Sequence, residues 1–373
     1  MEKAISFLIL IFVGILFRNK IKNKEQIDTI KTLILTLALP AAIFSALVKI
    51  KLNSSLIYFP LIVIAFNFLI FVSVRFVLPL FIGKNGNRAN MRTLMLMLSS
   101  FAPYLSCFPF IAEFSNESNL GIAAIADTGN KIFILVFLYL LAMYWSYSKE
   151  ASEKQKNVFQ QLSKTLLQPI NLTIILALTV SMFDVGIENI PMYFQDSIAH
   201  LRNLLTPTIL IFIGLAAKVK GKDLKFILGL LLWRSGITFL LSGLLLCFVK
   251  IDSVPTILLM VAFPQSSCSF IPYAQMTICS ELQADRKNIF NQSLALSLLA
   301  ISLPFSALII LSIYSSGSFF TSPVHLFELS FAAIVGSAWL LKQKAQKRQT
   351  VFTLVQQRSP ENKIPRSKTN ILG

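Results

Sequence analysis

The sequence predicts an all-α, polytopic membrane protein, and three features of the chain carry this prediction. Of its 373 residues, 55% are hydrophobic and only 14% are charged, whereas soluble domains carry about 25% charged residues. The mean hydropathy is +0.70, and apolar runs of roughly 20 residues, long enough to cross a bilayer as a helix, recur along nearly the whole chain. Two of these runs contain a pair of prolines near the middle, which predicts broken helices.

Ten spans are expected, followed by a shorter eleventh span near the C-terminus. The first apolar run lacks a small-residue cleavage site, so it is expected to remain as a short span. An uncleaved signal anchor predicts the same topology. The expected spans cover residues 4–17, 29–50, 56–82, 91–114, 119–146, 164–184, 197–217, 224–250, 254–280, 289–314 and 326–341.

Loop charge predicts the orientation. Lysine and arginine concentrate in the odd-numbered loops, as in residues 18–24 and 218–225, and again after residue 341. By the positive-inside rule, the odd loops and the C-terminal tail face the cytoplasm and the N-terminus faces outside. We therefore expect the plasma (inner) membrane as the location. The net charge of +17 lies between spans rather than in a folded basic domain, which argues against nucleic acid as a partner.

Prolines recur at a nearly constant separation, which indicates an internal repeat. Five spans fit into one period, and an odd number of spans turns the second copy upside down in the membrane. The sequence therefore predicts a ten-helix, five-plus-five inverted repeat. The pairs are Pro40 with Pro207, Pro103 with Pro264 and Pro109 with Pro272, at separations of 167, 161 and 163 residues.

The repeat defines the predicted organisation of the chain. We expect a first repeat at 1–147, a cytoplasmic linker at 148–163, a second repeat at 164–316, an extra span at 317–341 and a basic tail at 342–373. The tail is expected to be disordered. An orientation anchor is favoured for it over a specific lipid or partner site.

The two broken spans carry the candidate substrate site. In hydrocarbon, a break in a helix persists only where it lines a cavity or is buried in protein. Free N–H groups at two helix N-termini would attract an anion without any lysine or arginine, although two kinked helices packed without a ligand are the alternative. The predicted substrate-binding residues are Pro103, Tyr104, Ser106, Cys107 and Pro109 in the first break, and Pro264, Gln265, Ser266, Ser267, Ser269 and Pro272 in the second.

Ionisable residues in the predicted spans suggest a coupling site. Asp127 and Lys131 are four residues apart, so they share one helix face beside Asn130. Because charges inside a membrane are costly and usually functional, Asp127 is the candidate for proton coupling. A self-neutralised pair without a role is the alternative, and sodium coupling through Asn130 stays open. Arg75 and Arg234 are expected to snorkel toward the cytoplasmic interface rather than to clamp a substrate.

Short sequence patterns occur in a characteristic order: Leu39-Pro40-Ala41 with Phe44, the proline-broken fourth span, Asp127-x-Gly129-Asn130, Thr206-Pro207 with Ile213-Gly214-Leu215, and Phe263-Pro264. In this order, over residues 1–314, the chain resembles the auxin efflux carrier family, which includes bacterial permeases and the plant PIN-FORMED proteins. The resemblance implies a fold related to the bile-acid sodium symporters, with a scaffold domain and a transport domain whose broken fourth and ninth helices cross at the substrate site. It also implies organic anions, such as dicarboxylates or indole-3-acetate, as substrates.

The chain departs from this family at the breaks. The asparagine and the two glycines that are common in the family's fourth span are absent from residues 102–109, and Gln265 follows the proline of the ninth span instead of asparagine. The eleventh span and the basic tail also lie outside the family's usual plan. These departures affect the identity of the substrate more than the fold.

Together these features predict a secondary active transporter, or permease, that moves a small organic anion by alternating access. The alternative is a membrane sensor or scaffold that retains the transporter fold and signals through the eleventh span and tail. No GxxxxGK[ST] or HExxH pattern occurs, so neither ATP-driven transport by this chain nor an enzyme is expected, and no cofactor is expected beyond coupling H⁺ or Na⁺. The expected partners are the anion and the lipid bilayer, and a homodimer is left open.

Overall fold

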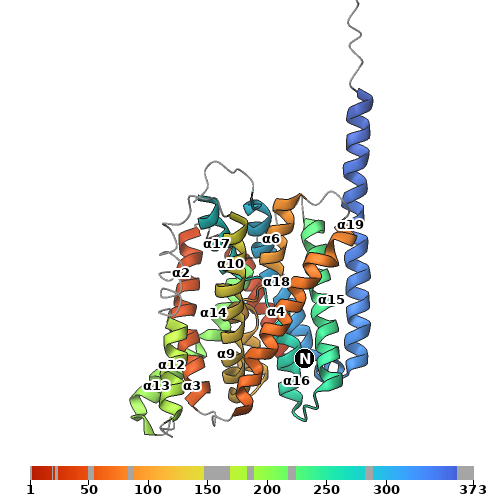
Figure 1. Ribbon diagram of the computed structural model, residues 1–373. Coiled ribbons are helices and arrows are strands. Elements are labelled where there is room, and N and C mark those ends of the chain that lie inside the picture. The colour runs from red at the N-terminus through yellow and green to blue at the C-terminus, as the bar shows by residue number, and fades with distance from the viewer. Residues whose placement is uncertain are drawn as a thin grey trace, which may run out of the picture.

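The computed structural model describes residues 2–18, 20–21, 24–48, 54–82, 87–146, 169–182, 189–216, 224–281 and 289–358, and this part of the chain folds into a bundle of helices without strands (Figure 1). Seven of the described helices are long and apolar enough to cross a membrane. The protein is therefore an all-α integral membrane protein, as the composition predicts.

The seven membrane-length helices coincide with seven of the expected spans. The other expected spans contain shorter or interrupted helices in the described residues. The seven are Glu25–Ser45, Tyr58–Ile82, Glu117–Ser146, Met192–Leu215, Leu224–Phe248, Gln292–Thr321 and Pro323–Lys342.

The first half of the chain contains α-helices together with short π and 3₁₀ segments, which are labelled η. Its elements are α1 (Glu2–Phe17), α2 (Lys24–Leu33), η1 (Ile34–Ala38), α3 (Leu39–Val48), η2 (Ser54–Ile57), α4 (Tyr58–Phe76), α5 (Leu78–Ile82), α6 (Arg88–Leu98), α7 (Pro103–Ser106), α8 (Phe108–Phe114), α9 (Glu117–Ile132), η3 (Phe133–Leu138) and α10 (Tyr139–Ser146).

The second half continues in the same manner. Its elements are α12 (Pro169–Met182), α13 (Met192–Asn203), α14 (Leu205–Ala216), α15 (Leu224–Phe248), α16 (Val254–Ala262), η6 (Phe263–Gln265), α17 (Phe270–Glu281), α18 (Gln292–Ser316), η7 (Gly317–Thr321) and α19 (Pro323–Arg358). The expected linker at 148–163 lies outside the described residues.

Both proline-rich spans are interrupted. In the first, α6 ends at Leu98 and α7 begins at Pro103, so residues 99–102 are not helical. In the second, α16 continues into the 3₁₀ turn η6 and α17 begins at Phe270, which leaves residues 266–269 outside any helix. Proline is tolerated at the first positions of a helix because the N–H groups there have no intrahelical partner. Pro103 occupies such a position, whereas Pro264 lies in the 3₁₀ turn that continues α16.

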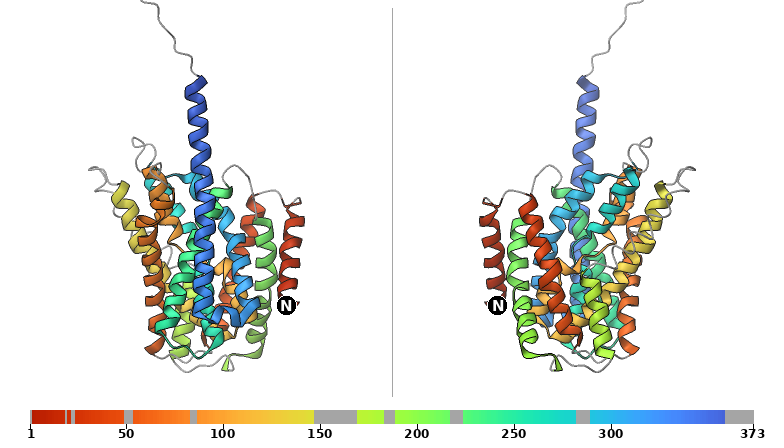
Figure 2. Two further views of the ribbon diagram at one scale, coloured as in Figure 1. Left: turned by 90° about the vertical axis from the view of Figure 1, so that its right-hand side faces the viewer. Right: turned by 90° about the vertical axis from the view of Figure 1, so that its left-hand side faces the viewer.

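Helices α1 and α14 approach each other closely through two glycines. A Cβ atom on Gly14 would lie 2.2 Å from the carbonyl oxygen of Ile211, and one on Gly214 would lie 2.1 Å from that of Ile11. Small residues allow backbones to touch in membranes, where close packing replaces the hydrophobic effect. Figure 2 shows α1 at the edge of the bundle, beside α14.

The eleventh span, α19, is an integral part of the bundle. It packs along the glycine stripe of α15, which consists of Gly229, Gly236 and Gly243 at intervals of seven residues. A Cβ atom on any of the three would meet an α19 side chain at 3.0 Å or less. The partners run in reverse order along α19, so the two helices lie antiparallel. These partners are Leu341, Ile334 and Phe327.

The first part of the basic tail, where the sequence predicts disorder, belongs to helix α19. Helix α19 continues to Arg358 and projects beyond the rest of the bundle (Figure 1). The segment after Leu341 is rich in lysine, glutamine, alanine and arginine, which favour helix, and the next proline is Pro360. Residues 359–373 lie outside the described residues.

Candidate functional site

The two interrupted segments, 99–102 and 266–269, touch each other, and we call the region where they meet the crossing. Ala102 and Ser267 form an isolated antiparallel bridge, in which the N–H of Ala102 donates to the carbonyl oxygen of Ser267 at 2.8 Å. The hydroxyl of Ser106 accepts from the N–H of Ser267 at 3.0 Å and donates to the carbonyl oxygen of Ala102 at 2.9 Å. Predicted residues of both breaks thus come into direct contact.

Three consecutive backbone N–H groups, those of residues 267–269, form a donor row at the crossing. They donate to the hydroxyl oxygens of Ser106, Ser302 and Ser100 at 3.0, 3.2 and 3.3 Å, respectively. The three serines come from α7, α18 and the first break. Because buried backbone donors are costly when unpaired, these hydroxyls stabilise the second break.

The expectation of two helix N-termini with free N–H groups stays a prediction, and the structure limits it in two respects. At the second break, the donors of residues 267–269, which precede α17, are paired with serine hydroxyls, and the N–H of Ile271 in the first turn of α17 donates to the hydroxyl of Ser269 at 3.3 Å. At the first break, Cys107 divides the second half-helix into α7, with four residues, and α8, with seven, and Pro103 and Pro109 have no N–H to offer. The first break therefore lacks a long helix whose N-terminus could attract an anion.

Arg234 of α15 lies at the crossing, and the prediction that it snorkels to the interface is wrong. Its side chain is only 4% exposed. Nη2 donates to the carbonyl oxygen of Ser100 at 3.3 Å, Nη1 lies 3.9 Å from Sγ of Cys268, and the guanidinium lies 5.1 Å from the ring centroid of Phe101. Its Nε is buried without a hydrogen-bond partner. Arg75 of α4, in contrast, is exposed.

The sequence pointed to Arg234 but predicted the wrong direction for its side chain, because α15 is apolar around its circumference and no polar stripe shows which face is buried. The internal repeat could have indicated that Arg234 is buried. Asn67, which is fully buried on α4, and Arg234 are 167 residues apart, the same separation as Pro40 and Pro207. Each of the two lies on the third predicted span of its half and contacts a group at the crossing.

Asn130 of α9 supports the first break. Its Oδ1 accepts from the N–H of Phe101 at 3.2 Å and from Nδ2 of Asn67 at 3.1 Å. Its Nδ2 donates to the carbonyl oxygen of Phe101 at 3.0 Å and to Oδ1 of Asp127 at 2.7 Å. The amide thus replaces the helical hydrogen bonds that the chain loses at the break.

The predicted pair of Asp127 and Lys131 is confirmed as an ion pair, with 3.4 Å between Nζ and Oδ2. The two side chains are 1% and 12% exposed, so the pair is screened from solvent. Nζ of Lys131 also lies 4.7 Å from the ring centroid of Tyr104, which is within cation–π range. Tyr104 thereby connects the predicted coupling residues to the predicted substrate-binding residues of the first break.

Other predicted residues stabilise the second break rather than face a ligand. Oε1 of Gln265 accepts from the hydroxyl of Ser235 at 2.7 Å, and its Nε2 donates to the carbonyl oxygen of the same residue at 3.3 Å. The hydroxyl of Ser266 donates to the carbonyl oxygen of Phe263 at 2.6 Å. Cys107, Pro109, Pro264 and Pro272 are buried, and Ser269 donates its N–H at the crossing as described above.

In this conformation the crossing is closed. Beside it lies a hollow of about 20 Å³, lined only by apolar side chains of α4, α9, α16 and η6, including Pro264. A single water needs at least about 10–15 Å³. An organic acid therefore does not fit between these elements unless the helices move apart.

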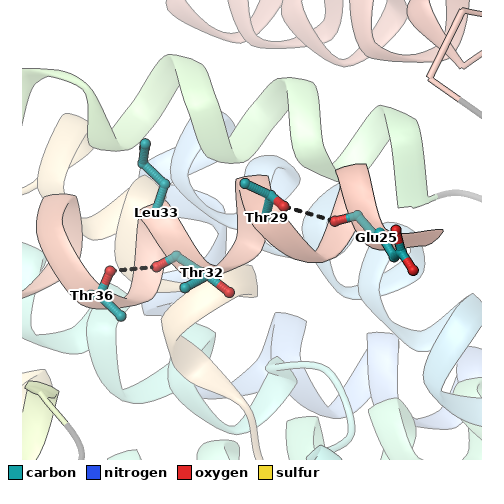
Figure 3. Close-up of a pocket in the computed structure, with 5 residues that line it drawn as sticks. All are labelled: Glu25, Thr29, Thr32, Leu33 and Thr36. Carbon is teal, nitrogen blue, oxygen red and sulfur yellow. Dashed lines mark hydrogen bonds between the residues drawn. The ribbon is translucent and has the colours of Figure 1, made fainter. Parts of the chain in front are cut away.

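A larger open hollow, of about 470 Å³, lies along α2 and η1 (Figure 3). It is lined by Glu25, Thr29, Thr32, Leu33 and Thr36, which all come from this one continuous helical segment. The hydroxyls of Thr29 and Thr36 donate to backbone oxygens one turn earlier, at 2.9 and 2.8 Å. Because polar groups from different elements do not converge in it, this hollow lacks the features of a binding site.

No family model matches the chain, and no curated protein matches it.

Proposed function

We propose that the protein is a secondary active transporter that moves a small organic anion, a carboxylate, across the membrane by alternating access. The observation that carries the proposal is the crossing of two interrupted helices in a membrane bundle, next to the buried cation of Arg234. Interrupted helices and buried charges are costly in a bilayer and are retained mainly where they serve a function. An anion is the ligand whose charge complements Arg234.

The packing of the helices supports a division into two groups. In one group, α1 packs on α14, and α3 packs on α12 and α13. In the other, α4 packs on α9, α6 on α18, and α10 on α17, and the two groups meet where α3 packs on α9. We assign the first group as a scaffold and the second as the moving part of a five-plus-five inverted repeat, like that of the auxin efflux carrier family. The constant separation of the proline pairs supports the same repeat.

Alternating access in this arrangement requires the crossing to open. The contact between Ala102 and Ser267 and the bonds from the donor row to the three serines would separate when the substrate enters. In inverted repeats, the two halves exchange conformations, so one site faces each side of the membrane in turn. We place the protein in the plasma (inner) membrane with its N-terminus outside and its tail in the cytoplasm, as the loop charges indicate.

We propose proton coupling through Asp127. Its carboxylate is buried, paired with Lys131 and linked through Asn130 to the first break, so a change in its charge acts directly on the crossing. Sodium coupling through Asn130 has less support. The amide oxygen of Asn130 already accepts two hydrogen bonds, from Asn67 and Phe101, which a sodium ion would have to replace.

Flux measurements with the purified full-length protein test this proposal. Proteoliposomes would be loaded and assayed with labelled benzoate, indole-3-acetate and malate, with and without a pH gradient. We expect at least one of these acids to accumulate above its level in protein-free liposomes, which take up permeant weak acids passively, when a pH gradient is imposed. This excess should disappear when a proton carrier collapses the gradient. Absence of flux for all three acids, together with measurable binding of one of them, would contradict a transporter and favour a sensor.

A sensor is the second candidate, and the packing of α19 favours it. Arg234 lies on α15, whose glycine stripe packs along α19, and α19 extends beyond the bundle to Arg358. A ligand that moved α15 would therefore also move α19. The same flux and binding measurements distinguish the two candidates, because a sensor binds the acid without carrying it across the membrane.

A further inference from the structure

We propose that Arg234 and the donor row of residues 267–269 form a site that selects a single carboxylate, and that the hydroxyls of Ser100, Ser106 and Ser302 occupy this site when it is empty. The inference rests on the proposed function and deepens it, because it names the charge of the substrate. It predicts a monocarboxylate rather than a dicarboxylate.

The charge of Arg234 is the first argument. A guanidinium is always protonated in proteins, so this side chain carries its positive charge into the bundle. Within the described part of the chain, Arg234 forms no ion pair with a carboxylate. Its polar contacts are a carbonyl oxygen and a thiol, which are neutral acceptors. Its Nε has no hydrogen-bond partner. A buried charge in this situation is destabilising until an anion neutralises it.

The charge balance of the region selects a monoanion. The nearest carboxylate that the structure connects to the breaks, Asp127, is already paired with Lys131. While Asp127 carries its negative charge, the ion pair is neutral as a whole, so Arg234 contributes one uncompensated positive charge. One carboxylate neutralises this charge, whereas a dicarboxylate would leave a second negative charge buried. Burying an unpaired charge is costly, and this cost is the basis of the expected selectivity.

The donor row is the second argument. Its three N–H groups are consecutive and now donate to neutral serine hydroxyls, and a carboxylate oxygen in place of a hydroxyl would make a stronger, charge-assisted hydrogen bond. Each serine hydroxyl that now accepts from the row also donates to a backbone oxygen near its own position. The hydroxyls can therefore release the row and keep their own hydrogen bonds. These donor bonds run from Ser100 to Met97, from Ser106 to Ala102 and from Ser302 to Leu299 at 2.8, 2.9 and 3.3 Å.

Arg234 contacts two residues that also take part in the donor row. Its guanidinium contacts the carbonyl oxygen of Ser100 and the thiol of Cys268, and these two residues also take part in the bonds of the donor row. The Phe101 ring covers the guanidinium at 5.1 Å. A carboxylate that replaced the serine hydroxyls would thus lie beside the guanidinium and next to an aromatic ring. This environment suits an acid with a small apolar or aromatic body.

The test uses benzoate and terephthalate, which share one aromatic body and differ by a second carboxylate. Binding to the full-length protein in detergent would be measured by calorimetry and by thermal shift. We expect benzoate to bind about tenfold or more tightly than terephthalate. Equal binding of the two acids, or no binding of benzoate at millimolar concentration, would overturn the inference.

Substitutions of Arg234 and of Arg75 test whether the guanidinium of Arg234 binds the carboxylate. Arg234→Gln should weaken benzoate binding about tenfold or more, since it removes a charge-assisted pair. It should also leave the ligand-free protein at least as stable to heat as the original chain, because an uncompensated charge is removed. Arg75→Gln is the matched control and should change neither property. If Arg234→Gln binds benzoate as well as the original chain, or unfolds at a clearly lower temperature without ligand, the assignment is wrong.

Two further variants examine the donor row and the thiol. Ser302→Ala removes one hydroxyl that competes with the substrate, so benzoate should bind about threefold or more tightly. A hydroxyl with only a structural role would lower the unfolding temperature without tightening the binding. Cys268→Ala should retain benzoate binding, and loss of binding in this variant would show that the thiol, rather than the guanidinium, is the essential group.

The binding and flux measurements distinguish the carboxylate site at Arg234 from transport across the membrane. If terephthalate or malate crosses the membrane while Arg234→Gln transports as well as the original chain, the transporter stands and the inference falls. If benzoate binds with the expected dependence on Arg234 and no acid crosses the membrane faster than in protein-free liposomes, the site stands and the transporter falls.

Discussion

The side-chain amide of Asn130 bonds both backbone groups of Phe101, accepting from its N–H at 3.2 Å and donating to its carbonyl oxygen at 3.0 Å. Phe101 lies in the first interrupted segment, where the helix supplies neither partner. One side chain of α9 therefore holds the main chain of the crossing in place. The same amide donates to Asp127, so the ion pair and the break share one network of hydrogen bonds.

Asn130→Ala should destabilise the protein by about 3 kcal/mol, because it leaves two buried backbone groups of Phe101 unpaired at about 1–3 kcal/mol each. The loss would appear as a lower unfolding temperature of the purified protein in detergent. Asn116→Ala is a suitable comparison. Asn116 caps α9 by accepting from the N–H of Asn119 at 2.9 Å, and loss of such a cap costs about 1 kcal/mol. An Asn130 variant as stable as the Asn116 variant would refute the backbone role.

Asp127→Asn should abolish accumulation driven by a pH gradient while exchange of substrate between the two sides continues. It should also destabilise the protein by about 3 kcal/mol, because Lys131 loses its buried carboxylate partner. Adding Lys131→Gln should restore most of the stability without restoring the response to pH, since the Asp127 carboxylate is still absent. Flux at two external pH values and the unfolding temperature check these outcomes. Unchanged accumulation in Asp127→Asn would eliminate Asp127 as the coupling group.

The positions of the breaks and of the ion pair could be predicted because each follows from local sequence. Proline removes a backbone donor wherever it occurs, and a separation of four residues places Asp127 and Lys131 on one helix face. The structure shows both features.

The partners of the breaks could not be predicted in the same way. Asn130 bonds Phe101 and the Ser302 hydroxyl accepts from Cys268, and each contact depends on how distant helices pack. The burial of Arg234 depends on its contacts at the crossing, because α15 presents apolar residues on every side and does not itself indicate the buried face. A polar residue within an apolar span therefore indicates a buried polar contact, but the element that its side chain contacts is determined by tertiary packing.

Gly236→Val should disrupt the packing of α15 on α19. A Cβ atom at Gly236 would lie 2.7 Å from Cγ1 of Ile334 and 3.1 Å from the carbonyl oxygen of Ser330, so a branched side chain forces the helices apart. Overpacking of this kind costs about 1–3 kcal/mol or more. Gly336→Ala on α19 is the control. Its Cβ would meet Leu232 only at 4.0 Å, an ordinary contact, and alanine favours helix. Equal unfolding temperatures for the two variants would contradict a close seam between α15 and α19.

An ion pair between Glu117 and Arg202 joins the two helix groups. Glu117 is the first residue of α9, and Arg202 lies in the last turn of α13, which packs on α3. The two side chains are 38% and 35% exposed, and pairs this exposed contribute about 1 kcal/mol or less to stability. We expect the pair to favour the closed conformation without being needed for folding.

Arg202→Gln and Glu117→Gln should therefore each raise the rate of substrate exchange in proteoliposomes while the unfolding temperature changes little. In the original chain, high salt should raise the exchange rate in the same direction, because it screens an exposed pair. The double variant Glu117→Arg with Arg202→Glu restores opposite charges and should return the rate toward that of the original chain. If both single variants exchange substrate at the original rate at low and high salt, this contact does not control opening, and movement between α9 and α13 is not part of the transport cycle.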